Sequence, residues 1–98
     1  MAYSIQLSAE AVDHLRELKA RQQRIVLDAV REQLTHHPQT TTRNRKLLRP
    51  NVLAEWELRV ADLRVYYLVD EDAAVVSVIA FGVKQGNRVF VAGEELEL

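Results

Sequence analysis

Side chains able to carry acid–base or anion-binding chemistry occupy alternate positions of two short runs, at Glu55, Glu57 and Arg59 and then at Arg64 and Tyr66. Successive side chains of a β-strand point to opposite faces, so this spacing places each set on one face of its strand. A carboxylate accepts protons, a guanidinium grips an anion through paired hydrogen bonds, and a phenol donates one hydrogen bond. Whether the two sets act together depends on how the runs pair.

The two runs predict a tight β-hairpin whose loop is Ala61-Asp62. Apolar residues fill the remaining alternate positions, namely Ala54, Trp56, Leu58 and Val60 in the first run and Leu63, Val65, Tyr67 and Val69 in the second. A two-residue loop pairs Val60 with Leu63, Arg59 with Arg64, Leu58 with Val65, Glu57 with Tyr66 and Trp56 with Tyr67. This register gathers the apolar residues on a core face and the polar residues on the opposite face.

Arg59 and Arg64 lie directly opposite each other in this register. Like charges in that position cost up to about 1 kcal/mol, so a compensating anion is expected. Glu57, diagonal to Arg64, is a candidate for that role. The alternative is a charge-balanced lattice on the solvent-exposed face of an antiparallel sheet.

Length and composition predict one domain over residues 1–98, because 98 residues with 48% hydrophobic and 28% charged side chains can bury a single core. The absence of cysteine excludes disulfides, thiol chemistry and cysteine-based zinc sites, as is typical of a reducing cytosol. No apolar run reaches transmembrane length and no signal-peptide pattern opens the chain, so a cytoplasmic protein without membrane contact is expected. His36-His37 has no third ligand at useful spacing, and neither a metal nor a cofactor is predicted.

The net charge of -1 conceals an asymmetry along the chain. Residues 1–64 hold eleven of the thirteen Lys and Arg and eight of the fourteen Asp and Glu, a net charge of +3, whereas residues 65–98 carry -4. A surface that binds a polyanion is therefore possible only as a local patch, with the acidic tail turned away from it.

The first half of the chain predicts a strand and two helices. Tyr3, Ile5 and Leu7 alternate with polar residues, and Ser8 is a good N-cap for an amphipathic helix over about residues 9–20. The polar run 21–24 interrupts the apolar pattern, so a second helix is expected to start near Ile25 and to end at 35–38 before the proline.

The second half predicts a basic loop followed by three strands. Residues 39–52 form a polar loop with Arg43, Arg45, Lys46 and Arg49, which is either a phosphate-binding cluster or a solvated loop anchored by two leucines. After the hairpin we expect an acidic turn at 70–72, a buried strand at 74–81, a loop at 82–88 with Lys84 and Arg88, an extended segment at 89–91 and a mobile tail at 94–98.

Several short motifs occur in one order along the whole chain: an opening strand, a helix hairpin ending in Leu-x-x-x-Pro, Lys46-Leu47-Leu48, Trp56-Glu57-Leu58-Arg59, Arg64-Val65-Tyr66-Tyr67 and a strand end at 79–82. In these motifs and in its length the chain resembles the RelE/ParE superfamily of bacterial toxins from type II toxin-antitoxin modules. The resemblance implies an α+β fold in which the N-terminal strand and helix hairpin pack on an antiparallel-rich, four-stranded sheet.

RelE-like members of that superfamily cut messenger RNA in the ribosomal A site without metal, by driving a 2'-hydroxyl onto the neighbouring phosphate. This chemistry needs a base, cations that stabilise the phosphoryl oxygens, and an acid for the leaving 5'-oxygen. By position, the resemblance implies that Arg64 clamps the phosphate and that Lys84 is a second cation. Glu55 and Glu57 stand where RelE has lysines, and Phe90 stands where it has a catalytic tyrosine.

A carboxylate serves as the base in some relatives, so the candidate catalytic residues are Glu57, Arg59, Arg64 and Lys84. Phe90 can stack on a base without donating a proton, whereas Tyr66 can stack or supply a hydroxyl. The candidate RNA-binding residues are Arg43, Arg45, Lys46, Arg49, Tyr66, Arg88 and Phe90.

The superfamily resemblance allows two other hypotheses about activity. One is a ParE-like toxin that inhibits DNA gyrase without cutting RNA, and the other is an inactive member that only binds its antitoxin. An unrelated α+β binding module is a further alternative. All superfamily readings imply a cognate antitoxin as partner, with ribosome-bound messenger RNA or, alternatively, DNA gyrase as the target.

Overall fold

The computed structural model describes residues 2–98, which contain two helices and seven strands. The helices are α1 (Ala9–Glu17) and α2 (Ala20–Leu34). The strands are β1 (Ser4–Leu7), β2 (Arg45–Leu47), β3 (Trp56–Val60), β4 (Leu63–Asp70), β5 (Val75–Gln85), β6 (Arg88–Val91) and β7 (Glu94–Leu96).

The helix hairpin forms, but its break lies earlier than the polar run 21–24 suggested. Ser8 caps α1 by accepting a hydrogen bond from the Ala11 amide, and the chain becomes extended at Leu18 and Lys19. In the first turn of α2, the Gln22 side chain accepts from the Lys19 amide and the Gln23 side chain donates to the Leu18 carbonyl. The polar run therefore satisfies free groups at a helix start, and the prediction that it separates the two helices was wrong.

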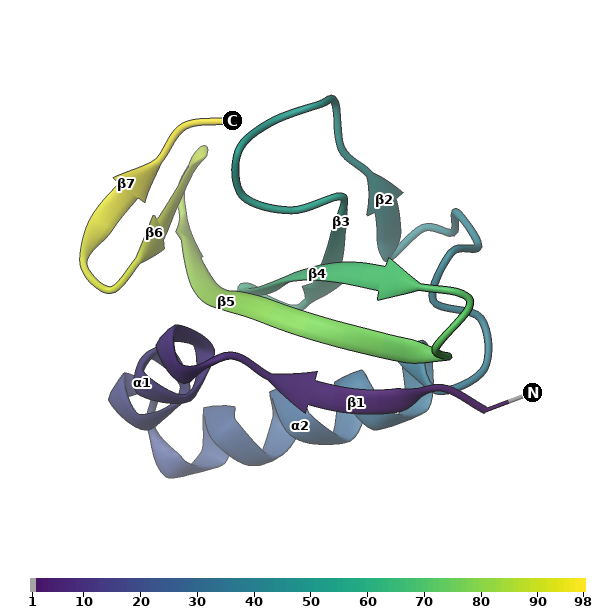
Figure 1. Ribbon diagram of the computed structural model, residues 1–98. Helices are drawn as coiled ribbons and strands as arrows, with labels where there is room; N and C mark the ends of the chain where they lie inside the picture. The colour runs from purple at the N-terminus through teal and green to yellow at the C-terminus, as the bar shows by residue number, and fades with distance from the viewer. Residues whose placement is uncertain (1) are drawn as a thin grey trace.

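All seven strands belong to one sheet, in the order β2-β3-β4-β5-β6-β7, with β1 paired in parallel to β5. Both helices cover one face of this sheet, and the chain between β2 and β3 rises on the other face, beside the C-terminus (Figure 1). Residues of α2 pack against inward-facing residues of β3, β4 and β5 to form the main core: Val26, Val30 and Leu34 with Trp56, Leu58, Val65, Tyr67, Val76 and Val78.

The central hairpin has the predicted loop and register, with all five expected pairs from Trp56–Tyr67 to Val60–Leu63. Trp56 and Tyr67 stack with ring centroids 6.2 Å apart. Ala54 does not join this main core as expected. It precedes β3 and packs with Tyr66 and Ala80 on the opposite face.

A bulge bends β5 in the middle of the sheet. Tyr66 lies opposite Ala80 and Tyr67 opposite Val78, so Ile79 has no partner on β4. The Ser8 hydroxyl donates to the Ile79 carbonyl, and the Phe81 amide donates to Nδ1 of His14. The N-cap and the last turn of α1 thus satisfy backbone groups beside the bulge, and the bend turns the end of β5 away from the helices (Figure 1).

The sheet is wider than the four strands expected from the sequence. Arg45–Leu47 of the predicted basic loop pairs with β3 as β2, and residues 82–85 of the second predicted loop continue β5. The tail was expected to be mobile, but Glu94–Leu96 pairs with β6 as β7. The two unexpected strands, β2 and β7, have only three residues each, so their conformation depends on the strand they pair with. No helix within residues 2–98 has the length and apolar character needed to span a membrane.

Candidate functional site

The sheet face opposite the helices carries a line of polar residues across neighbouring strands. Lys46 of β2 pairs with Glu57 of β3, Glu57 with Tyr66 of β4, and Tyr66 with Ala80 of β5. Glu57 is 8% exposed and Tyr66 is 1% exposed. The alternative of a solvated charge lattice is therefore wrong for these two residues, because a buried carboxylate needs specific partners.

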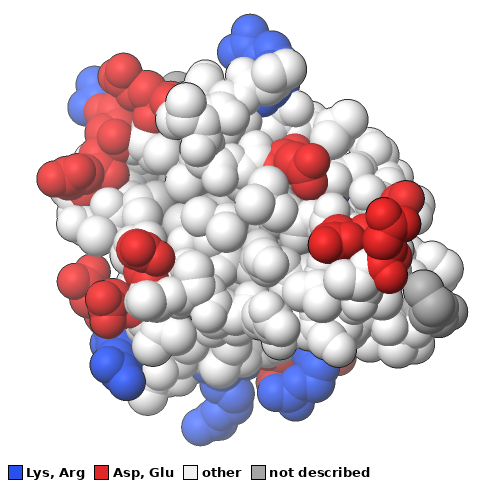
Figure 2. All heavy atoms as spheres, in the orientation of Figure 1, with Lys and Arg blue, Asp and Glu red and all other residues white. Residues whose placement is uncertain are grey.

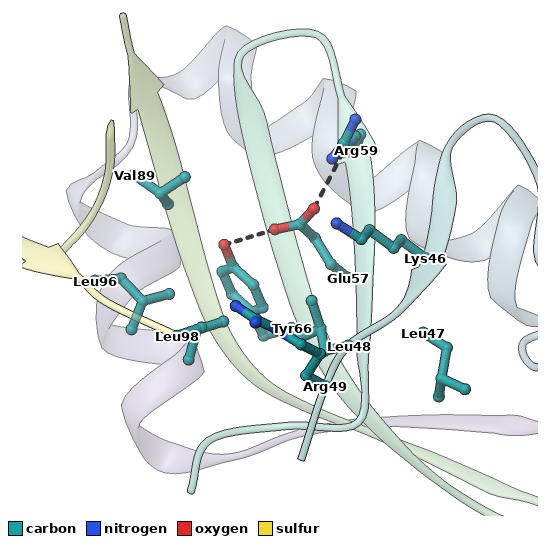
Figure 3. A pocket seen from close by; sticks show the side chains of 10 residues that line it. All are labelled: Lys46, Leu47, Leu48, Arg49, Glu57, Arg59, Tyr66, Val89, Leu96 and Leu98. Carbon is teal, nitrogen blue, oxygen red and sulfur yellow. Dashed lines mark hydrogen bonds and ion pairs between the residues drawn. The ribbon is translucent and has the colours of Figure 1, made fainter. Parts of the chain in front are cut away.

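Glu57 has a hydrogen-bond partner on each carboxylate oxygen. The Tyr66 hydroxyl donates to Oε2 at 2.9 Å, and Nε of Arg59 donates to Oε1 at 3.1 Å (Figure 3). Burial, and next the adjacent Glu57 charge, raise the pKa of the Tyr66 phenol above its ordinary value. Tyr66 therefore remains protonated and donates to Glu57, so the pair combines a negative charge with a bound proton.

This pair lines a cavity of about 530 Å³. Its cations are Lys46, Arg49 and Arg59, of which Arg59 has a side chain that is 47% exposed. The opposite wall is apolar and consists of Val89, Leu96 and Leu98 (Figure 3). Leu47 and Leu48 also line the cavity, but the Leu47 side chain points away from Glu57 in this view. In the same view the Lys46 amine points toward the Glu57 carboxylate. The cavity thus presents several cations around one carboxylate–phenol pair.

Arg64 has a different environment from the one expected. It is 7% exposed, and its Nη1 donates to the carbonyls of Ala61 and Leu63 at 2.8 Å each. Glu57, the expected anion for Arg64, pairs with Arg59 instead. The guanidinium of Arg64 is thus turned toward the hairpin loop, and it does not line the cavity.

Three candidate residues near the C-terminus lie outside the cavity. Lys84 is exposed and pairs with Val89, which places it on the cavity face but beyond the lining residues. Val89 packs with Tyr66 and Ala80, so alternation along β6 directs Phe90 and Arg88 to the other face. Nε of Arg88 lies 3.7 Å from Glu95 there. The structure therefore separates Phe90 and Arg88 from Glu57.

Of the four cations in the predicted basic loop, only two line the cavity. Nε of Arg45 donates to the Thr40 carbonyl at 3.0 Å and its Nη1 donates to the Gln33 carbonyl, so this side chain ties β2 to the end of α2. Arg43 is exposed and does not line the cavity, whereas Lys46 and Arg49 do. Glu55 is exposed, and its Oε1 accepts from the Val69 amide at 3.2 Å.

Sequence reasoning missed the apolar wall formed by Val89, Leu96 and Leu98. The alternation of acid and leucine in Glu-Glu-Leu-Glu-Leu is a strand signal that predicts one apolar face for the tail. Within residues 2–98, no three His, Cys, Asp or Glu side chains are grouped in a way that would hold a metal ion.

The chain matches the family model of the ParE toxin of type II toxin-antitoxin systems, parDE, over residues 5–86. Among curated protein sequences there is no significant match. A chain of the toxin-antitoxin complex RelBE2 from Mycobacterium tuberculosis has a similar fold, with a TM-score of 0.75 and 20% identity over 86% of this chain and 100% of that chain. A chain of the archaeal RelE-RelB complex from Pyrococcus horikoshii OT3 gives a TM-score of 0.68 and 22% identity over 88% of this chain and 98% of that chain.

These two structures confirm the expected α+β fold of two helices on an antiparallel-rich sheet. The family model covers most of the chain, including the hairpin that carries Glu57 and Tyr66. The protein therefore belongs to the ParE toxin family and, within the RelE/ParE superfamily, is the toxin of a type II toxin-antitoxin module.

Proposed function

We propose that this toxin is a RelE-like, ribosome-dependent mRNA interferase that acts in the cytoplasm without a metal. The observation that carries the proposal is the buried Glu57–Tyr66 pair, which lines an open cavity together with Lys46, Arg49 and Arg59. Such a combination of a proton acceptor, a proton donor and several cations is what phosphodiester cleavage by a 2'-hydroxyl requires.

Glu57 is the base in this proposal. Its carboxylate accepts the proton of the 2'-hydroxyl while that oxygen attacks the adjacent phosphorus, and the bond to the 5'-oxygen breaks. Tyr66 donates its proton to the leaving 5'-oxygen and recovers one from Glu57 through the 2.9 Å hydrogen bond between them. The products are a 2',3'-cyclic phosphate and a free 5'-hydroxyl, and both side chains return to their starting states.

The cations of the cavity stabilise the charge that develops on the phosphoryl oxygens. Arg59 serves as the phosphate clamp, because its guanidinium is half exposed and already aligned by Glu57. Lys46 and Arg49 add positive charge at the mouth of the cavity. Arg64, the clamp implied by the superfamily resemblance, supports the hairpin loop in this proposal.

The proposed partner is a cognate antitoxin, which neutralises the toxin by binding it. Both structural neighbours come from such complexes, the toxin-antitoxin complex RelBE2 and the archaeal RelE-RelB complex. The adjoining reading frame of the toxin gene is the place where such an antitoxin is expected.

The proposal predicts that Glu57→Gln lowers ribosome-dependent cleavage by roughly 10²-fold or more, because the amide cannot accept the proton. The matched control is Glu55→Gln on the same segment, whose side chain lies outside the cavity and which should cut at the parental rate. The measurement is primer extension on ribosome-bound messenger after circular dichroism has shown that both variants fold. Parental cleavage by Glu57→Gln would remove Glu57 from the mechanism.

A second candidate function is ParE-like inhibition of DNA gyrase, and the match to the ParE toxin family model favours it. The two activities stop different processes first when the toxin is induced in a bacterium. Messenger cleavage halts amino-acid incorporation within minutes, whereas gyrase inhibition first reduces thymidine incorporation and causes filamentation. Normal growth with verified soluble toxin would instead indicate an inactive member that only binds its antitoxin.

A further inference from the structure

The apolar wall of the cavity, formed by Val89, Leu96 and Leu98, has no part in the acid–base chemistry proposed above. Val89 and Leu96 are directly paired across β6 and β7, and Leu98 lies beside them in Figure 3. Valine and leucine side chains carry no hydrogen-bond donor or acceptor. Leu98 is 45% exposed, so part of the wall is still in contact with solvent. An apolar group of a ligand that covers this wall would therefore gain free energy.

The wall lies outside the part of the chain that matches the family model, which ends at residue 86. Its geometry comes from this chain's own β6 and β7. Val89 and Leu96 pack on the cluster of Ala54, Tyr66 and Ala80. This contact places the wall next to the phenol that donates a proton in the proposed reaction.

The acidic residues of the tail are turned away from the wall. Glu95 alternates with Leu96 along β7, pairs with Phe90 and lies 3.7 Å from Arg88 on the other face. Figure 2 shows acidic side chains at the outer left edge of the molecule, where β7 lies in Figure 1. Among the residues of 2–98 that line the cavity, Glu57 is the only acidic one. A phosphodiester can thus reach the wall without meeting the negative charge of the tail.

The position of the proton donor determines which side of a bound phosphodiester faces the wall. In Figure 3 the Tyr66 hydroxyl lies on the side of Glu57 that faces the apolar wall, and Lys46 and Arg59 lie on the opposite side. In the proposed reaction Tyr66 protonates the leaving 5'-oxygen. The nucleotide that carries this oxygen therefore lies on the side of the wall, and its base is the group that meets the leucines.

We propose that the apolar wall is a subsite for the nucleobase on the 3' side of the scissile phosphate. The wall holds the face of this base by van der Waals contact and makes no hydrogen bonds that would identify it. The inference rests on the RNA cleavage proposed above and adds the chemical group that this side of the cavity receives. A cavity of about 530 Å³ is typical of sites for small organic ligands and has room for a nucleotide.

The test uses a dinucleoside monophosphate whose first ribose is 2'-O-methylated. The methyl group removes the attacking hydroxyl, so the probe cannot be cut, and its single phosphate fixes which base lies on which side. The toxin carries ¹³C-labelled leucine and valine methyl groups, which are followed by NMR at millimolar probe. Protons of a 3' adenine should show intermolecular NOEs to the methyl groups of Leu96 and Leu98. NOEs from the 5' base instead, or no binding of the probe, would overturn the subsite.

Removal of the 3' base measures the contribution of the wall to binding. A probe with an abasic 3' ribose should bind the unsubstituted toxin about tenfold more weakly than the adenine probe, because the apolar contact is lost. In Leu98→Ala this difference should shrink to about threefold, since less apolar surface remains. An undiminished difference in Leu98→Ala would contradict the proposal.

The matched control is Ile25→Ala on α2. Ile25 is 41% exposed, close to the 45% of Leu98, and its side chain has the same number of carbon atoms. Because Ile25 does not line the cavity, this variant should keep the parental difference between the adenine and abasic probes. A reduced difference in Ile25→Ala as well would mean that the effect does not come from the wall.

Exchange of the 3' base tests whether the wall reads the edge of the base. Adenine and guanine probes should bind within about twofold of each other, and cytosine should bind more weakly because a pyrimidine offers less apolar surface. A site built to hydrogen-bond one base would instead discriminate more than about tenfold between adenine and guanine, and that result would overturn contact through the face alone.

These binding measurements involve neither the ribosome nor RNA cleavage. A toxin that holds the 3' base as predicted but cuts no messenger would overturn only the proposed enzymatic activity. A toxin that cuts messenger, but whose wall methyl groups show no contact with the base, would overturn only the subsite.

Discussion

Arg59 and Arg64 are paired across two neighbouring strands, yet their guanidinium groups have different surroundings. The Arg59 side chain is 47% exposed and bonded to Glu57, whereas Arg64 is 7% exposed and bonded to two loop carbonyls. A clamp for a phosphate must reach its ligand, and burial denies Arg64 that access. Arg59 therefore lines the cavity, whereas Arg64 stabilises the hairpin loop.

Arg64→Ala should lower the free energy of unfolding by roughly 1–3 kcal/mol, because it removes a donor from the buried Leu63 carbonyl and the partly buried Ala61 carbonyl. Urea denaturation followed by the fluorescence of Trp56, which stacks on Tyr67 in the core, measures this change. Arg24→Ala, an exposed arginine on α2, is the control that should leave stability unaltered. A stable Arg64→Ala variant that loses cleavage would restore the catalytic role implied by the superfamily resemblance.

At the scale of elements, the short strands β6 and β7 depend on the close approach of β6 to β5. A Cβ on Gly82 would lie 2.9 Å from Cγ1 of Val89 and 3.2 Å from the Phe90 carbonyl oxygen. Only glycine leaves this space free. Val89 and Leu96 then reach the face of Tyr66 and complete the apolar wall of the cavity.

Gly82→Ala should therefore displace β6 and destabilise the fold by roughly 1–3 kcal/mol, as overpacking of a tight contact does. Hydrogen exchange measured by mass spectrometry should show faster exchange in residues 88–96 than in the hairpin 56–69. Ser77→Ala, near the other end of the same strand, is the comparison and should retain parental exchange. Unchanged protection of 88–96 in Gly82→Ala would mean that β6 tolerates the extra methyl group.

Across the whole molecule, the two faces of the sheet differ in how far they are covered. Both helices cover one face. The other face is covered only in part, by the segment before β3 and by residues of β6 and β7, the strands that follow the bend in β5. Two consecutive tyrosines, Tyr66 and Tyr67, lie on opposite faces of the sheet. Tyr67 lies in the main core and its hydroxyl donates to the Pro38 carbonyl at 2.6 Å, while Tyr66 faces the cavity. Burial raises the pKa of both phenols, most strongly through desolvation of the phenolate.

The raised pKa values predict a loss of stability in alkali. Below the ordinary tyrosine pKa of about 10, both phenols are protonated in the folded and the unfolded chain. Above it, the unfolded chain releases protons that the folded chain retains, so the free energy of unfolding falls as pH rises. Urea titrations from pH 8 to pH 11 should show this decline, and Tyr66→Phe should make it shallower. A Tyr66→Phe variant with the parental slope would contradict a raised pKa at this residue.

The sequence by itself determined the central hairpin, its loop and its register, because period-two alternation allows only one pairing that keeps the apolar residues together. It also determined the start of α1 at Ser8 and the end of α2 before Pro38, since capping and proline sterics act within a few residues. These local patterns sufficed to place Glu57, Arg59, Arg64 and Tyr66 on one face.

Only the tertiary structure decided which of those polar residues form the cavity. Residues of β6 and β7 pack against Tyr66, and contacts far apart in the sequence, such as that of Arg45 with Gln33, removed other cations from the cavity. The strands β2 and β7 were missed, whereas β6 agrees with the extended segment expected at 89–91. Both missed strands have three residues, which are too few to be stable without the strand they pair with.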